Sequence, residues 1–512
     1  MATLVTSETD PVTPSTERWT PRAITRVVGL LAGVMVLLEL LHAGVIDSYD
    51  SGVYFDAAWR LWNGVVPYRD YVFVQPPGIT LVLAPAALVG HLVSTSAGFW
   101  VGRVMSGAAS VLNAVLVTSL LRSRGRVAMW VGGLAMTVTP ITNVVGTGVK
   151  LEPFFMMFVL LGLRRLFASP TMTPSRRDLV WAGAFFALAI SVKGWAVVPA
   201  LVAVVVLLPR LRHRLLALVV STTAGIALLF GPFFVLAPGA IWRQVVVDQV
   251  TRAVPSVTPT LNRLIDLSGY QGTWLAPNAF TVIGFLAVAG LAVYLAVTNP
   301  LRDPLGPFAG LTSVLATAAI LVTPQFFAYY CYLVTPYLAL ALALVGSRFV
   351  HSPRWRTWRA EPRARRLVVA TGALLVALLG GTTLSAYDQA ASAAAATATA
   401  AIDRYVPAGS CVVYDVVYLG VVTNRLSDSP HCPLIIDSYG MWLGNGNQLV
   451  APPRLFSEQW RRYFAHAQYV VLSNNESTFI PWTPALTRWF QGVYAPLYGK
   501  DGVHIFRRLA TR

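Results

Sequence analysis

Charged residues are scarce in this chain of 512 residues: they make up 12% of it, while hydrophobic residues make up 55%. A soluble globular protein carries about 25% charged residues, so the composition excludes that class. Several apolar stretches reach or exceed the roughly 18 residues that cross a bilayer as a helix. They include Val27–Ile46, Ala128–Val145, Leu215–Leu236, Phe280–Val297 and Leu367–Leu384. The sequence therefore predicts a polytopic α-helical membrane protein.

Acidic residues are fewer than basic ones, with 22 Asp and Glu against 39 Lys and Arg, which gives a formal net charge of +17. A basic balance is also found in nucleic-acid-binding proteins. Here, however, the arginines cluster in short loops between apolar runs, which is typical of cytoplasmic topology anchors. We therefore expect no nucleic-acid partner. The basic loops are Arg122–Arg126, Arg164–Asp178, Pro209–Arg214 and Arg348–Arg366.

Placing these loops in the cytoplasm gives a multi-pass plasma-membrane protein with a cytoplasmic N-terminus and an extracytoplasmic C-terminus. The first outer loop is then 47–78. The assignment needs Ile79–Ser96 to dip into the outer leaflet or pack on the bundle rather than cross, which leaves about eleven spans. Residues 1–24 lack the basic segment and short apolar core of a cleaved signal peptide. We predict a disordered cytoplasmic tail there.

The composition changes after the predicted transmembrane domain, residues 25–384. Residues 385–512 begin with an Ala-rich, helix-prone stretch, and short β-like runs then alternate with amphipathic helical stretches. This pattern predicts a small extracytoplasmic α/β domain. The expected strands are Ser410–Val417, Pro433–Gly440, Gln468–Ser473 and Gly502–Phe506, and the expected helices are Phe456–Ala467 and Pro484–Gln491.

Cysteine is rare, with three residues in the chain. Cys411 and Cys432 both fall in the predicted outer domain, where a disulfide is permitted. Two free buried thiols are the alternative. Cys331 begins an apolar run and is expected to serve packing. The sequence also lacks a His and Cys cluster with zinc-site spacing.

The unusual polar residues fall on the predicted outer side. Ionisable groups at membrane depth are costly and tend to mark a site, although each alone is equally compatible with a solvated loop charge. Their recurrence in successive outer loops favours a composite cavity. They are Asp47, Asp50, Asp56, Arg69, Asp70, Lys150, Glu152, Lys193, Arg243, Asp248, Arg252, Arg263 and Asp266, with Tyr329, Tyr330 and Tyr332 after Gln325.

The first outer loop contains the sequence SGVYFDAAWRLWNG, which is typical of a short amphipathic helix at the membrane interface. Trp59 and Trp62 are expected to anchor this helix, and Gly64 to end it. Asp50 precedes its first turn, where the helix dipole favours a carboxylate. An N-cap would also explain Asp50 or Asp47 without any catalytic role.

These loop residues resemble the first extracytoplasmic loop of GT-C superfamily glycosyltransferases, especially the protein O-mannosyltransferase and lipid A aminoarabinose transferase branch. The matching positions are Asp50, Tyr54, Ala57-Ala58, Gly64, Pro67-Tyr68 and Pro76-Pro77. The likeness continues in order through Gly146–Phe155, Ser191–Pro199 and Phe326–Leu342, so it covers the membrane region to about residue 346. This variant looks like the actinobacterial envelope enzymes.

Two positions depart from the family pattern. The family has Asp-Glu where this chain has Asp50-Ser51, and it has a lysine where this chain has Gln75. The resemblance implies that the lysine contacts the donor phosphate. That charge is therefore expected from Lys150, Lys193 or an arginine such as Arg69.

The resemblance implies transfer of a hexose or pentose, such as mannose or arabinofuranose, from a polyprenyl-phosphate donor. The acceptor is expected to be an envelope glycan, glycolipid or protein on the outer face of the bilayer. Transfer inverts the anomeric centre, with Asp50 as general base. No metal or other cofactor is expected. The substrate-binding residues implied are Asp47, Tyr54, Arg69, Gln75, Lys150, Glu152, Lys193 and Tyr330.

Two other classes of protein stay open at this point. A lipid or sugar flippase would also be polytopic, but would show inverted repeats and charges near the midplane. We find neither pattern in the sequence. An envelope-assembly protein with an inactive transferase fold is compatible with Ser51 and Gln75.

Overall fold

The computed structural model describes residues 19–42, 48–168, 173–252, 258–268, 279–297, 303–323, 325–353, 355, 357, 362, 366, 372, 389–445, 454–473 and 476–510. Within these residues, five helices are long and apolar enough to cross a membrane. They are Pro21–Leu41, Thr95–Arg124, Gly194–Leu211, Leu215–Leu236 and Leu305–Val322. Shorter apolar helices are Arg126–Val138, Val282–Leu295 and Thr335–Val350.

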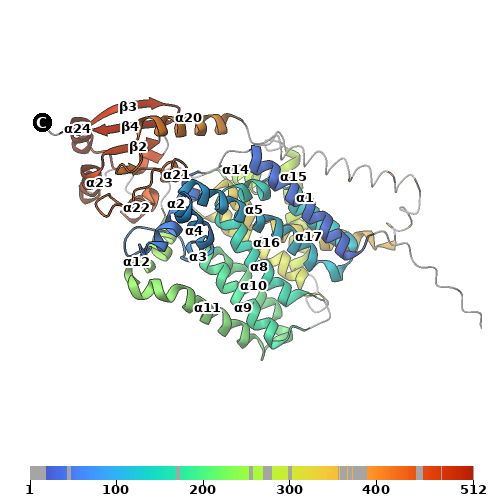
Figure 1. Cartoon of the computed structure of the whole chain (residues 1–512). Helices are drawn as coiled ribbons and strands as arrows, with labels where there is room; N and C mark the ends of the chain where they lie inside the picture. The colour runs from blue at the N-terminus through green and yellow to red at the C-terminus, as the bar shows by residue number, and fades with distance from the viewer. Residues whose placement is uncertain are drawn as a thin grey trace, which may run out of the picture.

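The helices of the membrane region form one bundle (Figure 1). In chain order they are α1 (Pro21–His42), α2 (Ser48–Trp62), α3 (Gly78–Val82), α4 (Ala84–Leu92), α5 (Thr95–Leu120), α6 (Arg126–Val138), α7 (Pro140–Thr147), α8 (Leu151–Phe167), α9 (Arg176–Val192), α10 (Val197–Leu211), α11 (Leu215–Leu236), α12 (Pro238–Trp242), α13 (Asp248–Val250), α14 (Thr260–Leu267), α15 (Ala279–Val297), α16 (Leu305–Val322) and α17 (Thr335–Val350). A 3-10 helix, η4 (Ala328–Leu333), precedes α17.

Helix α5 is central, because it packs against α1, α4, α6, α7 and α8. Small residues make this possible, since they let helix backbones approach closely in a membrane. A Cβ atom on Gly98 would lie 2.6 Å from the carbonyl oxygen of Ala86 in α4. A Cβ atom on Gly107 would lie 2.7 Å from the Val36 side chain in α1.

The predicted apolar spans have different outcomes. Leu215–Leu236 is helix α11, and Phe280–Val297 lies within α15. The stretch Ala128–Val145 is divided between α6 and α7 at Pro140, because proline has no N–H and holds the preceding residue extended. The predicted span Leu367–Leu384 lies outside the described residues except for Gly372.

The segment Ile79–Ser96 forms the two short helices α3 and α4, with α5 beginning at Thr95. Helix α3 has 5 residues and α4 has 9, so neither approaches the roughly 17 residues of a spanning helix. Gly78 brings α3 close to α9, because a Cβ atom there would lie 2.4 Å from the Ser191 hydroxyl.

Helix α2 is present where the sequence predicted a helix, and Gly64 follows it with a φ of +77°. The prediction that Trp59 anchors the helix at the interface is wrong. Its side chain is 4% exposed and stacks on His91 of α4 at 4.9 Å, because α2 is enclosed by neighbouring elements. Trp62 at the helix end is 52% exposed.

The C-terminal α/β domain begins with α20 (Gln389–Tyr405), which confirms the helix expected from the Ala-rich stretch. Its sheet has the order β1-β2-β4-β3. The β1–β2 pair is parallel, and the β2–β4 and β3–β4 pairs are antiparallel. The remaining elements are β1 (Val412–Tyr414), α21 (Tyr418–Val422), α22 (Ser438–Gly444), α23 (Arg454–His466), β2 (Tyr469–Ser473), α24 (Pro484–Val493), β3 (Tyr494–Lys500) and β4 (Val503–Arg508).

The predicted strand Pro433–Gly440 is wrong. The backbone there is irregular and then enters α22, because the Asp437 side chain caps that helix and accepts a hydrogen bond from the Gly440 amide at 2.7 Å. Strand β3 was not predicted, since Pro496 and Gly499 weaken the strand signal.

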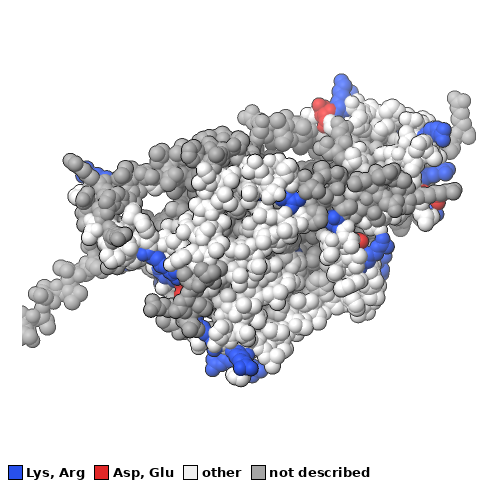
Figure 2. Space-filling model, turned by 180° about the vertical axis from the view of Figure 1, so that it is seen from behind, with Lys and Arg blue, Asp and Glu red and all other residues white. Residues whose placement is uncertain are grey.

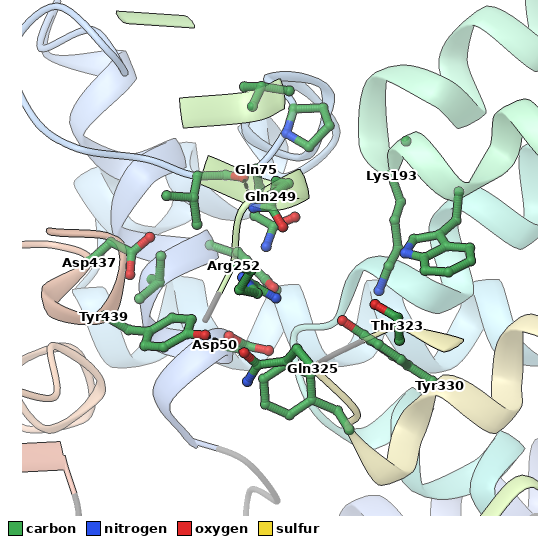
Figure 3. Close-up of a pocket in the computed structure, with 18 of the residues that line it drawn as sticks. Asp50, Gln75, Lys193, Gln249, Arg252, Thr323, Gln325, Tyr330, Asp437 and Tyr439 are labelled. Carbon is green, nitrogen blue, oxygen red and sulfur yellow. Dashed lines mark hydrogen bonds between the residues drawn. The ribbon is translucent and has the colours of Figure 1, made fainter. Parts of the chain in front are cut away.

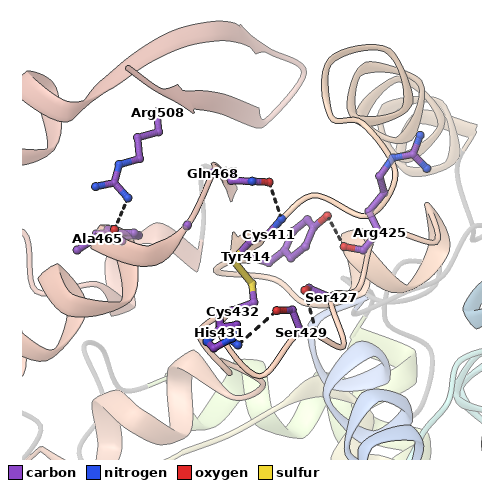
Figure 4. Close-up of a disulfide and its surroundings, with 12 residues drawn as sticks. Cys411, Tyr414, Arg425, Ser427, Ser429, His431, Cys432, Ala465, Gln468 and Arg508 are labelled. Carbon is purple, nitrogen blue, oxygen red and sulfur yellow. Dashed lines mark hydrogen bonds between the residues drawn. A yellow bond between two sulfur atoms is a disulfide. The ribbon is translucent and has the colours of Figure 1, made fainter. Parts of the chain in front are cut away.

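Cys411 and Cys432 form a disulfide with a Cα–Cα distance of 5.4 Å, which confirms the first of the two alternatives (Figure 4). The bond joins the residue before β1 to the loop that leads into α22. Cys331 is a buried free thiol.

The C-terminal domain packs on one end of the bundle, beside α2 (Figure 1). Helix α21 contacts both α2 and α5. Gly52 of α2 permits this contact, because a Cβ atom there would lie 2.5 Å from the Tyr418 backbone nitrogen. The Thr95 hydroxyl at the start of α5 donates to the Val421 carbonyl at 2.7 Å.

Figure 2 shows basic side chains at the lower edge of the bundle and also on the C-terminal domain. The basic segments 164–178 and 209–214 connect α8 to α9 and α10 to α11. Each lies about one helix length, roughly 25 Å, from the helix ends near Lys150 and Lys193. The broad face visible in Figure 2 between the two ends carries few charges. The basic segment 164–178 and the two lysines, Lys150 and Lys193, therefore lie at opposite ends of α8 and α9.

Candidate active site

A cavity of about 500 Å³ lies between the bundle and the C-terminal domain (Figure 3). Residues from helices and loops that are far apart in the sequence line the cavity. They are Tyr49, Asp50, Val53, Tyr54, Val74, Gln75, Pro76, Lys193, Gly194, Trp195, Val198, Val245, Gln249, Val250, Arg252, Thr323, Gln325, Phe327, Tyr329, Tyr330, Asp437, Tyr439 and Phe479. No other described cavity brings a comparable set of ionisable groups together.

Asp50 lies in the first turn of α2 and points into this cavity. Its Oδ2 atom accepts a hydrogen bond from the Tyr329 hydroxyl at 2.8 Å and lies 3.5 Å from the Lys150 Nζ atom. Burial raises the pKa of Asp50, but Lys150 and the Tyr329 hydrogen bond outweigh this effect. The pKa is therefore below its ordinary value, and the carboxylate is ionised at neutral pH.

Two lysines approach Asp50 from the ends of neighbouring helices. Lys150 immediately precedes α8, and Lys193 immediately follows α9. The Lys193 ammonium forms an ion pair with Glu152 in the first turn of α8. Lys150, Lys193 and Glu152 are all less than 10% exposed, so their opposite charges compensate the cost of burial.

Tyrosines of η4 fill the space between these charges. The Lys150 Nζ atom lies 4.5 Å from the Tyr329 ring centroid, and the Lys193 Nζ atom lies 4.9 Å from that of Tyr330. Both distances suit cation–π attraction. Burial raises the pKa of Tyr330 to about 12, so its hydroxyl stays protonated at neutral pH and is a potential donor.

Arg252 is a further cation at the cavity. Its guanidinium carbon lies 5.2 Å from the Tyr439 ring centroid, and it forms no ion pair with a carboxylate in the described part of the chain. The sequence placed Arg252 on the predicted outer side, but nothing in the sequence distinguished it from Arg243 or Arg263. The fold separates them, since only Arg252 of the three lines the cavity.

The C-terminal domain closes the side of the cavity opposite Lys193 (Figure 3). Asp437 accepts a hydrogen bond from the Tyr49 hydroxyl at 2.8 Å, and the Tyr439 amide donates to the same hydroxyl at 2.7 Å. The Tyr439 hydroxyl donates to Gln325. Burial raises the pKa of Asp437, and hydrogen bonds from Gly440 and Tyr49 oppose only part of this effect.

The structure brings together most of the residues that the sequence proposed for the site. Asp50, Tyr54, Gln75, Lys193 and Tyr330 line the cavity. Lys150 and Glu152 lie directly behind it as partners of Asp50 and Lys193.

Arg69 is not part of the cavity. It forms an ion pair with Asp70 at 2.7 Å and donates to the Gly64 carbonyl, so it stabilises the turn after α2. Asp47 lies outside the described residues.

Sequence reasoning missed Gln249, Asp437, Tyr439 and Phe479 as site residues. Asp437 and Tyr439 lie almost 390 positions from Tyr49, and only the docking of the two parts of the chain brings them together. The local signal at Asp437 is that of an N-cap before Ser-Tyr-Gly, which indicates a helix start and no substrate. Among the described residues, no group of His, Cys, Asp and Glu is arranged to hold a metal ion.

Comparison with solved structures finds proteins of similar fold, whereas comparison of the sequence finds none. No family model matches the sequence, and no curated protein matches it. The structure is similar to that of ArnT from Cupriavidus metallidurans bound to undecaprenyl phosphate, with a TM-score of 0.62 and 15% identity over 95% of this chain and 98% of ArnT.

Two structures of the oligosaccharyltransferase from Archaeoglobus fulgidus are also similar. The apo form has a TM-score of 0.56 and 15% identity over 97% of this chain and 75% of the archaeal protein. The form in complex with an inhibitory peptide and a dolichol phosphate has a TM-score of 0.55 and 14% identity over the same shares. The chain therefore shares the fold of ArnT and of the archaeal oligosaccharyltransferase, in agreement with the fold that the sequence resemblance predicted.

Proposed function

From this fold and this cavity, we propose that the protein is a membrane glycosyltransferase that moves a sugar from a polyprenyl-phosphate donor to a hydroxyl group of a cell-envelope acceptor. One observation carries the proposal: an ionised Asp50 carboxylate lies in a cavity between lysines on one side and the C-terminal domain on the other. Undecaprenyl phosphate bound to ArnT and dolichol phosphate bound to the archaeal enzyme support a polyprenyl phosphate as the carrier.

The reaction is a displacement at the anomeric carbon. The acceptor oxygen forms a bond to C1 of the sugar while the bond from C1 to the phosphate oxygen breaks. The bonding electrons leave with the polyprenyl phosphate, and the acceptor proton moves to Asp50, so the anomeric configuration inverts. Asp50 is the catalytic residue, because its carboxylate reaches the cavity directly.

Cations must stabilise the charge that develops on the departing phosphate. Gln75 occupies the position of the family's lysine and lines the cavity without charge. We assign this role to Lys193 and Arg252, which line the same cavity, with Arg252 able to bind phosphate through two parallel hydrogen bonds. Lys150 instead holds Asp50 ionised, and Glu152 holds Lys193 in place.

The polyprenyl chain needs an apolar surface next to the phosphate. Trp195, Val198 and Val245 provide one within the cavity wall. The segment Ile79–Ser96 does not line the cavity. We therefore place the first isoprene units against Trp195 and Val198.

The arrangement supports a reaction on the extracytoplasmic side. The cavity lies at the end of the bundle opposite the basic loops Arg164–Asp178 and Pro209–Arg214. Arginine-rich short loops remain in the cytoplasm. The cavity and the C-terminal domain then face outward, where lipid-linked sugars meet envelope acceptors.

The test is sugar transfer by purified protein in detergent, with synthetic polyprenyl-phosphate mannose and polyprenyl-phosphate arabinofuranose as donors. Release of free polyprenyl phosphate is the readout. We expect Asp50→Asn to lower kcat by about 100-fold or more, because the base is lost while the shape is kept. Asp70→Asn is the matched control. Asp70 is also an aspartate of the segment 47–78, but its carboxylate pairs with Arg69 and does not line the cavity.

Equal activity of the Asp50→Asn and Asp70→Asn proteins would show that Asp50 is not the general base. No release from either donor, with an envelope extract supplied as acceptor, would contradict the transferase and favour a flippase or an inactive fold. Where release is observed, the donor whose radiolabelled sugar appears on the acceptor identifies the sugar that is transferred.

A further inference from the structure

Three aromatic side chains of the C-terminal domain form a cluster on the side of the cavity away from Lys193. Tyr439 and Phe479 line the cavity, and Trp442 packs against both of them. Tyr439 and Trp442 come from one face of α22, and Phe479 ends a 3-10 helix, Glu476–Phe479. The Tyr439 ring centroid lies 4.9 Å from that of Phe479 and 5.8 Å from that of Trp442. Trp442 and Phe479 are also 5.8 Å apart. We call these three residues the aromatic platform.

The aromatic platform lies at the edge of the core of its domain, and Trp442 packs against that core. That core is built around Trp460, Phe464 and Phe490, which are at most 5% exposed. All three platform side chains are half-buried instead, and Tyr439 and Phe479 form part of the cavity wall. Large aromatic rings left partly open beside a cavity indicate a binding surface.

Polar groups surround the platform at the cavity. Gln325 accepts a hydrogen bond from the Tyr439 hydroxyl, and the Arg252 guanidinium lies over the Tyr439 ring. Asp437 lies in the same wall. Aromatic rings in a cavity wall beside amide, carboxylate and guanidinium groups suit a sugar, whose C–H groups pack on rings while its hydroxyls form hydrogen bonds.

A peptide acceptor that binds by strand addition fits this wall less well. Extended peptides gain affinity by pairing with an exposed strand edge. None of the described residues that line the cavity belongs to β1, β2, β3 or β4. The wall offers rings and side-chain polar groups in place of backbone pairing.

From this arrangement we infer that the aromatic platform is the acceptor site of the transferase and takes a carbohydrate, the terminal sugar of a glycan or glycolipid, rather than a peptide. The inference rests on the proposed function for the reaction that follows binding. Figure 3 shows Asp50 between Tyr439 on one side and Lys193 on the other. A sugar on the platform thus presents a hydroxyl to Asp50 while the donor phosphate lies toward Lys193.

Ligand binding to the full-length protein in detergent tests the inference, using saturation-transfer NMR to detect contact and thermophoresis to measure Kd. The probes are a linear mannohexaose, a linear arabinofuranosyl hexasaccharide and a threonine-containing decapeptide. The variants are Phe479→Leu and Trp442→Leu, which keep apolar volume but remove a ring. Trp489→Leu is the control, because Trp489 is a half-buried tryptophan of α24 that packs on the same core as Trp442 but is not part of the aromatic platform.

We expect one of the hexasaccharides to bind the wild type and Trp489→Leu equally. Its Kd should rise about tenfold in Phe479→Leu and in Trp442→Leu, while Phe479→Tyr restores binding because it restores the ring. The decapeptide should neither bind nor compete. Hexasaccharide binding that ignores the two leucine variants, decapeptide binding that depends on them, or no hexasaccharide binding at all would overturn the inference.

Binding and reaction are measured separately, so the two proposals fail separately. Asp50→Asn should still bind the hexasaccharide. Platform-dependent binding without release of polyprenyl phosphate from any donor would leave the sugar site standing and remove the proposed reaction. Release of polyprenyl phosphate without hexasaccharide binding would support the proposed reaction and contradict the sugar site.

Discussion

Asp50 shows how single residues control the chemistry of this cavity. Burial alone would favour the protonated carboxyl, which could not accept a proton from an acceptor. Lys150 and the Tyr329 hydroxyl reverse that preference, and the pKa of Asp50 lies below its ordinary value. Lys150 is thereby a positioning and charge-compensating residue, since it acts through Asp50 at 3.5 Å.

The first prediction concerns Lys150→Gln. Without the ammonium, only the Tyr329 hydrogen bond, Lys193 and Arg252 oppose the effect of burial. The pKa of Asp50 therefore rises, and the base becomes protonated at a higher pH. The acidic limb of the pH profile of kcat/KM should therefore move upward by about one to three pH units. Lys150→Arg should restore the wild-type limb. Lys500→Gln, at an exposed site on β3, should leave it unchanged, and an unmoved limb in Lys150→Gln would show that Lys150 does not set the charge of Asp50.

At the scale of elements, the site depends on the placement of α2, which carries Asp50 and Tyr54. Packing rather than intrinsic helix preference holds this helix, because its buried face contacts α3, α4 and α21. Gly52 is the tightest point, where the Tyr418 backbone nitrogen would lie 2.5 Å from an added Cβ atom. Backbone atoms cannot rotate away as a side chain can.

The second prediction is that Gly52→Ala separates α2 from α21, lowers the free energy of unfolding by about 1–3 kcal/mol and reduces transfer. Gly33→Ala is the matched control, since Gly33 also lies in a helix but has no atom within 4 Å of the added Cβ. That change should be neutral or stabilising by about 0.5–1 kcal/mol. Thermal unfolding in detergent measures both, and equal melting temperatures would refute the role given to Gly52.

At the scale of the whole molecule, the cavity exists only where two folded parts meet. The bundle supplies the lysines and Asp50, and α22 of the C-terminal domain supplies Asp437 and Tyr439. The Cys411–Cys432 disulfide fixes the loop before α22 to the start of β1, across a sequence separation of 21 residues. It therefore limits how far the α22 wall of the cavity can move.

The third prediction is that Cys411→Ser combined with Cys432→Ser destabilises the C-terminal domain by about 3 kcal/mol. Amide hydrogen exchange should accelerate in β1 and α22 and stay unchanged in α8, which belongs to the bundle. Reduced wild-type protein should reproduce the variant. Unchanged exchange in α22 would show that the disulfide does not support the cavity wall.

The sequence by itself determined the membrane class, the resemblance to GT-C glycosyltransferases and the helix that carries Asp50. Apolar length, helix starts and short motifs can all be recognised without knowledge of tertiary contacts. It also identified Lys150, Glu152, Lys193 and Tyr330, since each interrupts or borders an apolar run. Local signals failed at Trp59 and at Pro433–Gly440, where neighbouring elements and the Asp437 cap decided burial and backbone.

Only the tertiary structure decided which of these charges meet. It paired Lys150 with Asp50 and Lys193 with Glu152, directed Arg69 to Asp70, and selected Arg252 from several similar arginines. It also brought the aromatic platform to the cavity. The physical reason is that these contacts join segments up to almost 390 residues apart, and their geometry follows from how the helices and the C-terminal domain pack.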